Sequence, residues 1–198
     1  MGLVTTGDSF EYTSSPHPLR ESDPCYPTSL HGITKLAATL QAQSVARVKQ
    51  RPIVTLRLFS TYGPDDHPRR LVPITLRSAL SDRALNLSRP EIARDWIYIE
   101  DLIELYLEAG HRAKTLAGKV FNAGTGVNTN LAALVEMVLR LTASTAETHW
   151  GVFTAPAHDD YPWVADMTHT FEHFNWRPRI FLEAGLQKTI AQIKLTQA

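Results

Sequence analysis

The chain has 198 residues, 43% of them hydrophobic, and its 20 basic and 20 acidic residues leave no formal net charge. This length can bury the core of one domain, and the charge balance excludes partners that bind by bulk electrostatics, so we expect neither nucleic acid nor a membrane surface as partner. Cys25 is the only cysteine, which excludes an internal disulfide and a cysteine metal cluster and favours a cytoplasmic location.

The first predicted element is a strand over Leu3 to Thr6, whose residues are apolar or β-branched. Gly7 ends the strand, and a proline-rich loop follows from Glu11 to Pro27. The sequence holds no apolar run long enough to cross a membrane, and Met1 does not open a basic stretch followed by an apolar one. We therefore expect neither a membrane span nor a leader segment.

A helix follows the loop, with Thr28 or Ser29 as its cap and an interior rich in Ala, Leu, Gln and Arg from Lys35 to Val48. His31 and Lys35 lie one turn apart on the same helix face. The lysine cation favours the neutral form of the histidine, which can accept a proton, so the pair is a candidate acid/base site. Spacing alone, however, favours a solvated histidine and lysine in the first part of a helix.

Strand and helix patterns alternate through the rest of the chain, which predicts the α/β class. Ile53 to Phe59 is mostly apolar, as in a strand of a parallel sheet that is covered on both faces. The later elements are predicted, in chain order, as helix Leu71–Leu80, strands Ala84–Leu87 and Asp95–Ile99, helix Glu100–Ala109, strand Lys119–Asn122, a tight turn at Gly124 and Gly126, helix Leu131–Leu141 capped by Thr129, a strand near His149–Phe153, a short helix around Thr168–Phe174 and a last helix from Glu183 to about Ile193.

Short motifs occur in a fixed order along this pattern. They are Leu3 to Thr6 (Leu-Val-Thr-Thr), Leu19 to Pro24 (Leu-Arg-Glu-Ser-Asp-Pro), Pro27 to Lys35 (Pro-Thr-Ser-Leu-His-Gly-Ile-Thr-Lys), Leu56 to Pro64 (Leu-Arg-Leu-Phe-Ser-Thr-Tyr-Gly-Pro), Arg94 to Asp101 (Arg-Asp-Trp-Ile-Tyr-Ile-Glu-Asp), Phe121 to Gly124 (Phe-Asn-Ala-Gly) and a closing set between Ala165 and Leu186. Together they resemble the NAD-dependent epimerase/dehydratase family, the extended short-chain dehydrogenases/reductases that act on nucleotide sugars. Pro27 to Lys35, for example, is similar to that family's Pro-x-Ser-x-Tyr-Gly-x-Ser-Lys signature.

The resemblance implies the C-terminal part of a Rossmann-like parallel sheet with a small α/β substrate-binding lobe, in one truncated domain over residues 1–198. Residues 1–64 and parts of 90–125 would belong to the Rossmann-like core, and residues 65–90 and 126–198 mainly to the lobe. The resemblance also implies NAD or NADP as the cofactor and a nucleotide sugar as the ligand.

The same resemblance gives catalytic positions to Thr6, His31 and Lys35. In the family, a tyrosine at the position of His31 takes a proton from a sugar hydroxyl while hydride passes to NAD. A lysine matching Lys35 lowers the pKa of that tyrosine and holds the nicotinamide ribose, and a Ser/Thr like Thr6 bonds the same hydroxyl. Lys35 is therefore expected in both catalysis and cofactor binding.

Binding positions follow from the later motifs. By resemblance, Phe59 would lie near the nicotinamide and Ser60 near the sugar. Arg94 matches an arginine that grips the nucleotide diphosphate, a role suited to the forked donors of a guanidinium. The Asp-Glu pair of the family's sugar dehydratases is only loosely matched around Asp8, with Ser9 in the place of the glutamate. This favours epimerisation, an isomerase reaction, or reduction over dehydration.

Two departures from the family pattern argue against catalysis by the isolated chain. His31 replaces the tyrosine, and an imidazole is shorter than a phenol, so it reaches less far toward a sugar. The sequence contains no Gly-x-x-Gly-x-x-Gly turn after a first strand, and it begins where the second half of the family pattern begins. We expect an inactive isolated chain; the alternatives are an active epimerase or reductase completed by a partner chain, and a non-catalytic nucleotide-sugar-binding or regulatory module.

Two further expectations concern partners and metals. Leu3 to Thr6 is expected at an apolar sheet edge, which a second copy or another chain would cover. Asp65-Asp66-His67 and His158-Asp159-Asp160 look like metal ligands, but neighbouring loop residues rarely converge on one ion. We therefore expect no metal site.

Overall fold

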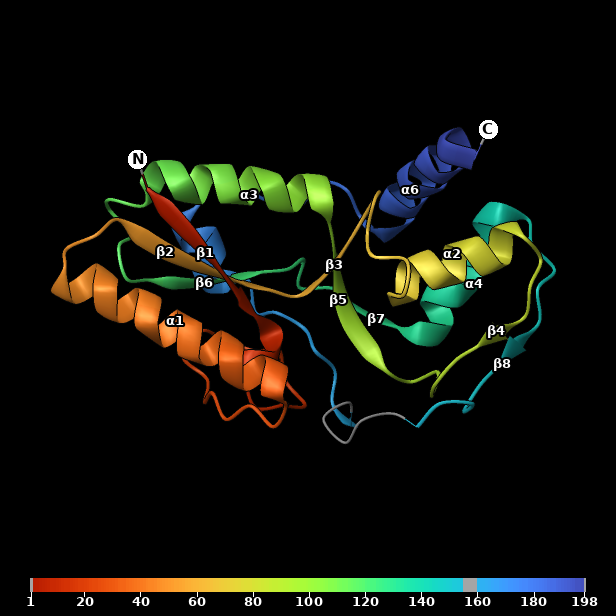
Figure 1. The fold of residues 1–198 in the computed structure, drawn as a ribbon, viewed down its shortest axis with the longest axis horizontal. Helices are drawn as coiled ribbons and strands as arrows, with labels where there is room; N and C mark the ends of the chain where they lie inside the picture. Colours follow the sequence, from red (N-terminus) through yellow and green to blue (C-terminus); the bar gives the residue numbers. More distant parts are fainter. Residues whose placement is uncertain (1, 155–159, 198) are drawn as a thin grey trace.

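The computed structural model describes residues 2–154 and 160–197, which form a three-layer core beside a second lobe (Figure 1). In the core, a parallel sheet in the order β1-β2-β6 joins β1 (Leu3–Asp8), β2 (Ile53–Leu58) and β6 (Val120–Ala123). Helices α1 (Leu30–Val48) and α3 (Ile99–Arg112) cover its two faces. The predicted α/β class with a parallel sheet is confirmed.

The core strands form where the sequence is apolar. All residues of β2 except the last are buried, because α1 and α3 shield both faces of the sheet. β1 extends to Asp8 and pairs with β2 from Leu3 opposite Ile53 to Asp8 opposite Leu58. Among the described residues, β1 has a strand neighbour on one side only, so it forms the predicted sheet edge.

Helix α1 begins at a cap that the sequence identifies. The Ser29 hydroxyl accepts a hydrogen bond from the Gly32 amide at 3.0 Å. Gly32 lies against the 3-10 turn η1 (Ser9–Glu11), where a Cβ atom would stand 2.2 Å from the carbonyl oxygen of Phe10. Glycine alone permits this approach, which brings the start of α1 to the carboxyl end of β1.

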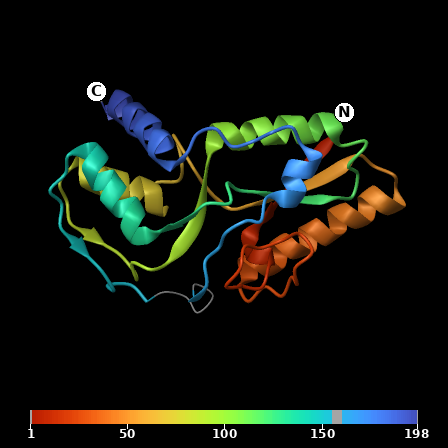
Figure 2. The same ribbon diagram turned by 180° about the vertical axis from the view of Figure 1, so that it is seen from behind.

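The second lobe is built on a small mixed sheet in the order β3-β5-β7, in which β5 pairs parallel with β3 and antiparallel with β7. Its elements are β3 (Ser60–Tyr62), α2 (Leu71–Leu80), β4 (Leu85–Asn86), β5 (Ala93–Tyr98), β7 (Asn128–Asn130), α4 (Leu131–Thr142), β8 (Thr148–His149) and α6 (Leu182–Gln197). Helix α5 (Thr168–His173) instead packs on β6 of the core, on the side that Figure 2 turns toward the viewer.

The core and the lobe have separate apolar interiors. One interior includes Leu56 and Phe121 of the sheet, and the other includes Leu76 and Leu134 from the helices of the lobe. Ile99, at the junction of β5 and α3, packs against both. The residue boundaries that the sequence gave to core and lobe stay a prediction.

Some sequence predictions are wrong in detail. The cap of α4 is Asn130, whose carboxamide accepts a helix amide at 2.8 Å, and not Thr129, which lies within β7. The strand expected near His149–Phe153 is only Thr148–His149, since the chain turns at Gly151 with a φ of 74°. None of the helices in the described ranges is both long and apolar enough to cross a membrane.

Candidate functional site

The carboxyl end of β1 and the start of α1 form a group that we call the strand-end site: Thr6, Asp8, His31 and Lys35. The Lys35 ammonium donates to the Thr6 carbonyl oxygen at 3.1 Å, and His31 Nε2 lies 3.1 Å from Asp8 Oδ2. The three residues predicted as catalytic therefore come together at the carboxyl edge of a parallel sheet, where α/β proteins bind their ligands. Their catalytic roles stay a prediction.

Asp8 is held in place by its position at the start of η1. Its Oδ1 accepts a hydrogen bond from the Phe10 amide at 2.9 Å, and Glu11 Oε1 accepts one from the Asp8 amide at 2.9 Å. This reciprocal capping box leaves Oδ2 of Asp8 for His31. Sequence reasoning missed Asp8 as a partner of His31, although the Asp-x-x-Glu spacing of residues 8–11 is a recognisable capping signal.

The His31 imidazole is oriented but accessible. Its side chain is 54% exposed and that of Asp8 is 23% exposed. When the imidazole is neutral and donates its Nε2 hydrogen to Asp8, Nδ1 keeps a lone pair that can accept a proton. A carboxylate that orients a base in this way is the geometry of acid/base sites. The Phe10 ring meets the imidazole edge-on, with 6.3 Å between ring centroids.

The Thr6 hydroxyl already has a partner inside the protein. It lies 2.6 Å from the phenol oxygen of Tyr106, which projects from α3. Burial raises the pKa of Tyr106, so its phenol is protonated at neutral pH. Tyr106 was missed in the sequence because it is 100 residues from Thr6 and belongs to none of the motifs.

A buried ion pair lies beneath the strand-end site. Glu11 is fully buried, and its Oε2 accepts a hydrogen bond from Arg57 Nε at 2.7 Å. Its Oε1 accepts from the Thr39 hydroxyl at 2.8 Å, and the Arg57 guanidinium stacks over the Tyr12 ring at 4.5 Å. These contacts tie η1 to α1 and β2, so they hold the elements that carry the strand-end site.

A second candidate region, which we call the lobe cavity, has a volume of about 280 Å³. Its lining includes Phe10, Ser60, Asp66, Arg70, Arg94 and Trp96. The structure therefore brings Ser60 and Arg94, the two residues predicted to bind substrate, to one cavity. Phe10 links this cavity to the strand-end site, because its ring also contacts His31.

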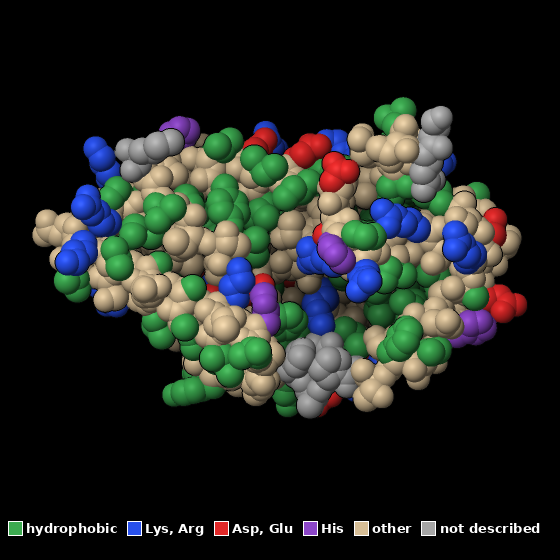
Figure 3. All heavy atoms as spheres, viewed as in Figure 1, with side chains coloured by type: hydrophobic (Ala, Val, Ile, Leu, Met, Phe, Trp, Pro, Cys, Tyr) green, Lys and Arg blue, Asp and Glu red, His purple; other side chains and the backbone are tan. Residues whose placement is uncertain are grey.

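The lobe cavity is rich in hydrogen-bond donors. Arg70 Nη1 pairs with Asp66 Oδ1 at 3.1 Å, and Arg94 Nη1 donates to the Ala93 carbonyl at 3.0 Å. Trp96 is 8% exposed, and its buried Nε1 has no hydrogen-bond partner among the described residues. Leaving a buried donor unpaired costs about 1–3 kcal/mol, so this indole N–H is an unsatisfied group in the wall of the cavity. Figure 3 shows Lys and Arg side chains around the hollow at the centre of this face.

Phe59 is placed differently from the other predicted site residues. Its side chain is 5% exposed and packs in the apolar interior of the core. Its amide donates to the Ala123 carbonyl at 3.0 Å, which continues the pairing of β2 with β6. Burial leaves little of the Phe59 ring for a ligand. The predicted contact of Phe59 with a cofactor stays a prediction.

Asp95, next to Arg94, is a buried carboxylate that holds the turn after β6. Its carboxylate accepts hydrogen bonds from the amides of Thr125 at 2.7 Å and Gly126 at 2.8 Å. Burial raises the pKa of Asp95, while these hydrogen bonds act in the opposite direction. A Cβ at Gly124 would stand 2.4 Å from Asp95 Oδ2, which explains the glycine. Asp95 thus fixes the predicted turn against β5.

Of the two triplets that resembled metal ligands in the sequence, only Asp65 to His67 lies wholly within the described residues, and it is not among the groups that converge there. Asp66 is engaged with Arg70 and with the His67 amide, and His158 and Asp159 lie outside the described residues. A different group, His169, Glu172 and His173 on α5, has ligand atoms within 4.8 Å of one another. Sequence reasoning missed it, although the His-x-x-Glu-His spacing on a helix is a usable signal.

Comparison with known proteins gives one consistent result. A model of the NAD dependent epimerase/dehydratase family matches residues 4–124. The dTDP-D-glucose 4,6-dehydratase of Mus musculus is 26% identical over 178 residues, which are 86% of this chain and 49% of that protein. The dTDP-4-dehydro-6-deoxyglucose reductase of Escherichia coli is 25% identical over 192 residues, 92% of this chain and 58% of that protein. The chain spans about half the length of the curated relatives it matches.

Solved structures show the same fold. A dTDP-glucose 4,6-dehydratase from Bacillus anthracis in complex with NAD has a TM-score of 0.89 and 24% identity, covering 99% of this chain and 62% of that one. A UDP-glucuronic acid 4-epimerase from Bacillus cereus, in complex with UDP-glucuronic acid and NAD, has a TM-score of 0.87 and 23% identity, covering 98% and 61%. The likeness confirms the predicted Rossmann-like fold. The chain matches about 60% of each of these two proteins.

Proposed function

Because the chain belongs to the NAD dependent epimerase/dehydratase family, we propose that it binds a nucleotide sugar in the lobe cavity and that the 198 residues alone do not catalyse turnover. One observation carries the binding proposal: Ser60, Arg94 and Trp96 line one cavity. We further propose that the chain acts in the cytoplasm, since its lone cysteine leaves no internal disulfide to form.

The chemistry of the lobe cavity suits a nucleoside diphosphate joined to a sugar. Guanidinium groups such as those of Arg70 and Arg94 bind phosphate oxygens through paired N–H donors. Apolar walls at Phe10 and Ile92 suit the flat face of a base or sugar ring. Pockets for drug-sized ligands are about 300–1,000 Å³, so a cavity of about 280 Å³ takes part of such a ligand.

The residues present fit one half of the implied cofactor. NAD or NADP, when bound, would supply the hydride acceptor or donor. Lys35 and Thr6 stand at the carboxyl edge of the sheet, where they would face a nicotinamide ribose. The 198 residues contain no Gly-x-x-Gly-x-x-Gly turn to cradle a pyrophosphate. We therefore propose weak or no dinucleotide binding by this chain alone.

The strand-end site supports the proposed inactivity. His31 has the orienting carboxylate of a general base, but its imidazole is shorter than a phenol at the same place and is turned toward Asp8. Lys35 donates to the Thr6 carbonyl instead of to a catalytic side chain. Without a complete dinucleotide site, a proton acceptor here has no hydride transfer to accompany.

A ligand-induced thermal shift tests the binding proposal. UDP-glucose, UDP-glucuronic acid and dTDP-glucose are each added to the purified chain, and at least one should raise its melting temperature. Arg94→Ala should weaken that binding by about 1.5–3 kcal/mol, roughly ten- to a hundredfold, because charge-assisted hydrogen bonds are lost. Arg94→Lys should lose less, since it keeps the charge but not the fork. Circular dichroism checks that both variants fold.

The matched control is Arg77→Ala, which removes an exposed arginine of α2 that does not line the lobe cavity. It should leave the thermal shift unchanged. No shift with any of the three nucleotide sugars, or an equal shift in Arg94→Ala and the native chain, would contradict the binding proposal. Turnover of a nucleotide sugar by the chain with added NAD would contradict the proposed inactivity.

A second candidate function, an enzyme completed by another chain or a second copy, is favoured by the surface around β1. Leu3 at the sheet edge is 53% exposed, and Leu30, Leu40 and Val48 of α1 are 78%, 53% and 74% exposed. Figure 3 shows apolar side chains on the face that carries β1, α1 and α3. Co-expression with a glycine-rich Rossmann half, followed by size exclusion and an activity assay, tests it: a stable, active complex supports this candidate.

A further inference from the structure

Three potential metal ligands lie together on α5, away from the lobe cavity. His169, Glu172 and His173 occupy positions i, i+3 and i+4 of one helix, so they share a face. One ligand atom from each lies within 4.8 Å of the other two. A single ion bound to all three needs this kind of convergence.

The ring of His173 is oriented by a second contact. Its Nδ1 lies 3.0 Å from the His169 carbonyl oxygen. A carbonyl only accepts, so Nδ1 carries the hydrogen and Nε2 keeps its lone pair. Histidines that bind metals characteristically donate their other ring N–H to a carbonyl or carboxylate, which fixes the tautomer. His173 is thus prepared to bind an ion through Nε2.

The ring of His169 is held by stacking. It lies parallel to the Phe121 ring of β6, with 4.9 Å between centroids and 15° between planes, and its own centroid is 4.3 Å from that of His173. Its contacts with the rings of Phe121 and His173 leave the imidazole little freedom to turn. Both imidazoles are therefore fixed before any ion arrives.

Lys119 occupies the position that an ion would take at His173. Its Nζ lies 2.8 Å from His173 Nε2, where the ammonium donates to the ring lone pair. Lys119 is exposed and precedes β6, so its flexible side chain can move into solvent. The ammonium and an ion compete for the same lone pair.

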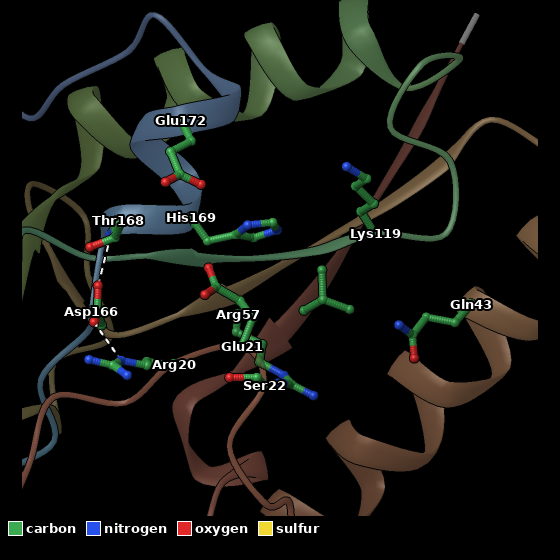
Figure 4. A pocket seen from close by; sticks show the side chains of 11 residues that line it. Arg20, Glu21, Ser22, Gln43, Arg57, Lys119, Asp166, Thr168, His169 and Glu172 are labelled. Atoms are coloured by element: carbon green, nitrogen blue, oxygen red, sulfur yellow. Dashed lines mark hydrogen bonds and ion pairs between the residues drawn. The ribbon is translucent and has the colours of Figure 1, made fainter.

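Space for an ion and its water ligands lies beside the cluster. A cavity of about 670 Å³ is lined by His169, Glu172 and Lys119, with Glu21 and Asp166 also on its wall. Figure 4 shows His169 and Glu172 projecting from α5 and Lys119 near the start of β6. Two imidazoles and one carboxylate, with an open side toward solvent, match the donor set of a zinc site that keeps one position for water.

We propose that His169, Glu172 and His173 bind a divalent transition-metal ion of the zinc type, and that Lys119 competes with the ion for His173. The donor set favours zinc over magnesium or calcium, which prefer oxygen ligands. The bound ion would fasten α5 to β6, because His169 stacks on Phe121. This proposal is independent of nucleotide-sugar binding.

Titration calorimetry of the chelator-treated full chain with zinc chloride tests the site. The native chain should bind one equivalent. His173→Gln and Glu172→Gln should each weaken binding by about tenfold or more, since loss of even an outer-shell partner costs about 10–100-fold. Glu172 is exposed, so its substitution should not disturb the fold. Lys119→Met, which removes the competing ammonium but keeps an apolar stem, should tighten binding severalfold.

The matched control is His149→Gln. His149 is an exposed histidine of β8 in the lobe, and it lies near Glu147, which precedes that strand. It should leave zinc binding unchanged. Visible absorption of bound cobalt(II) gives a second readout that should fall in His173→Gln with the fold intact. Absence of binding, or equal zinc affinity in the native chain and both ligand variants, would overturn the site. An unchanged or lower affinity in Lys119→Met would overturn the competition at His173.

Discussion

The strand-end site and the lobe cavity lie next to each other, yet their polar groups are used in opposite ways. In the strand-end site, Lys35 bonds the Thr6 carbonyl and His31 bonds Asp8. Trp96 lines the lobe cavity, and its buried Nε1 has no partner in the described part of the chain. The polar groups of the first site bond one another, while one buried donor beside the second is left unpaired.

The polar groups of the two regions affect the stability of the fold in different ways. An exposed pair such as His31 and Asp8 contributes little to stability, about 0–1 kcal/mol, because water screens it. The buried pair of Glu11 and Arg57 beneath it is costly to break, since one charge would be left without a partner. A buried unpaired donor, in contrast, carries a free-energy cost until a ligand arrives. Substitutions in the two regions should therefore differ in size and sign.

The largest effect is expected for Glu11→Gln, which removes the charge that pairs with Arg57. Breaking a buried ion pair on one side costs about 3–5 kcal/mol, so the free energy of unfolding in urea should fall by about that amount. Glu136→Gln, at an exposed position of α4, is the control and should change it by less than about 0.5 kcal/mol. A loss below about 1 kcal/mol for Glu11→Gln would mean that the ion pair does not support the strand-end site.

Trp96→Phe should move stability and ligand affinity in opposite directions. The variant removes an unpaired buried donor, so the free energy of unfolding should stay equal or rise by up to about 1 kcal/mol. Nucleotide-sugar affinity should fall by about 0.5–1.5 kcal/mol, roughly two- to tenfold, because the ligand loses one hydrogen bond. Urea unfolding and calorimetric titration measure the two quantities on the same samples.

Trp176→Phe is the matched control for that pair of measurements. The Trp176 indole is also buried, but its Nε1 donates to the Asp101 carbonyl at 2.8 Å. Its removal should lower the free energy of unfolding by about 1 kcal/mol and leave ligand affinity unchanged. If Trp96→Phe destabilised the chain as much as Trp176→Phe does, the Trp96 N–H would have a partner within the protein.

The sequence predicted most of the elements because their signals are local. The apolar run at Ile53–Phe59, the cap at Ser29 and the apolar spacing in Leu131–Leu141 each act within a few residues. Strands β3 and β7 were missed because three residues are too few to show an alternating pattern. Local signals therefore determine where elements begin and end, but not which elements meet.

The contacts of the candidate sites are mostly long-range. The ordered motifs brought Ser60 and Arg94 into the prediction, and the structure places them at one cavity. The pairing of Thr6 with Tyr106 spans 100 residues, and no periodicity connects the two. The unpaired state of Trp96 is a property of its surroundings, so it could not be read from residue type or spacing.

The smallest structural effect is expected for His31→Tyr, which restores the family's residue in the strand-end site. His31 is exposed and its pairing with Asp8 is screened, so the free energy of unfolding should change by less than about 1 kcal/mol. Activity should stay at background when NAD and a nucleotide sugar are added, because a phenol cannot supply the missing pyrophosphate cradle. His111→Tyr, at an exposed position of α3, controls for the added aromatic surface. Formation of NADH or epimerised sugar by His31→Tyr alone would show that the histidine, and not the cofactor site, limits this chain.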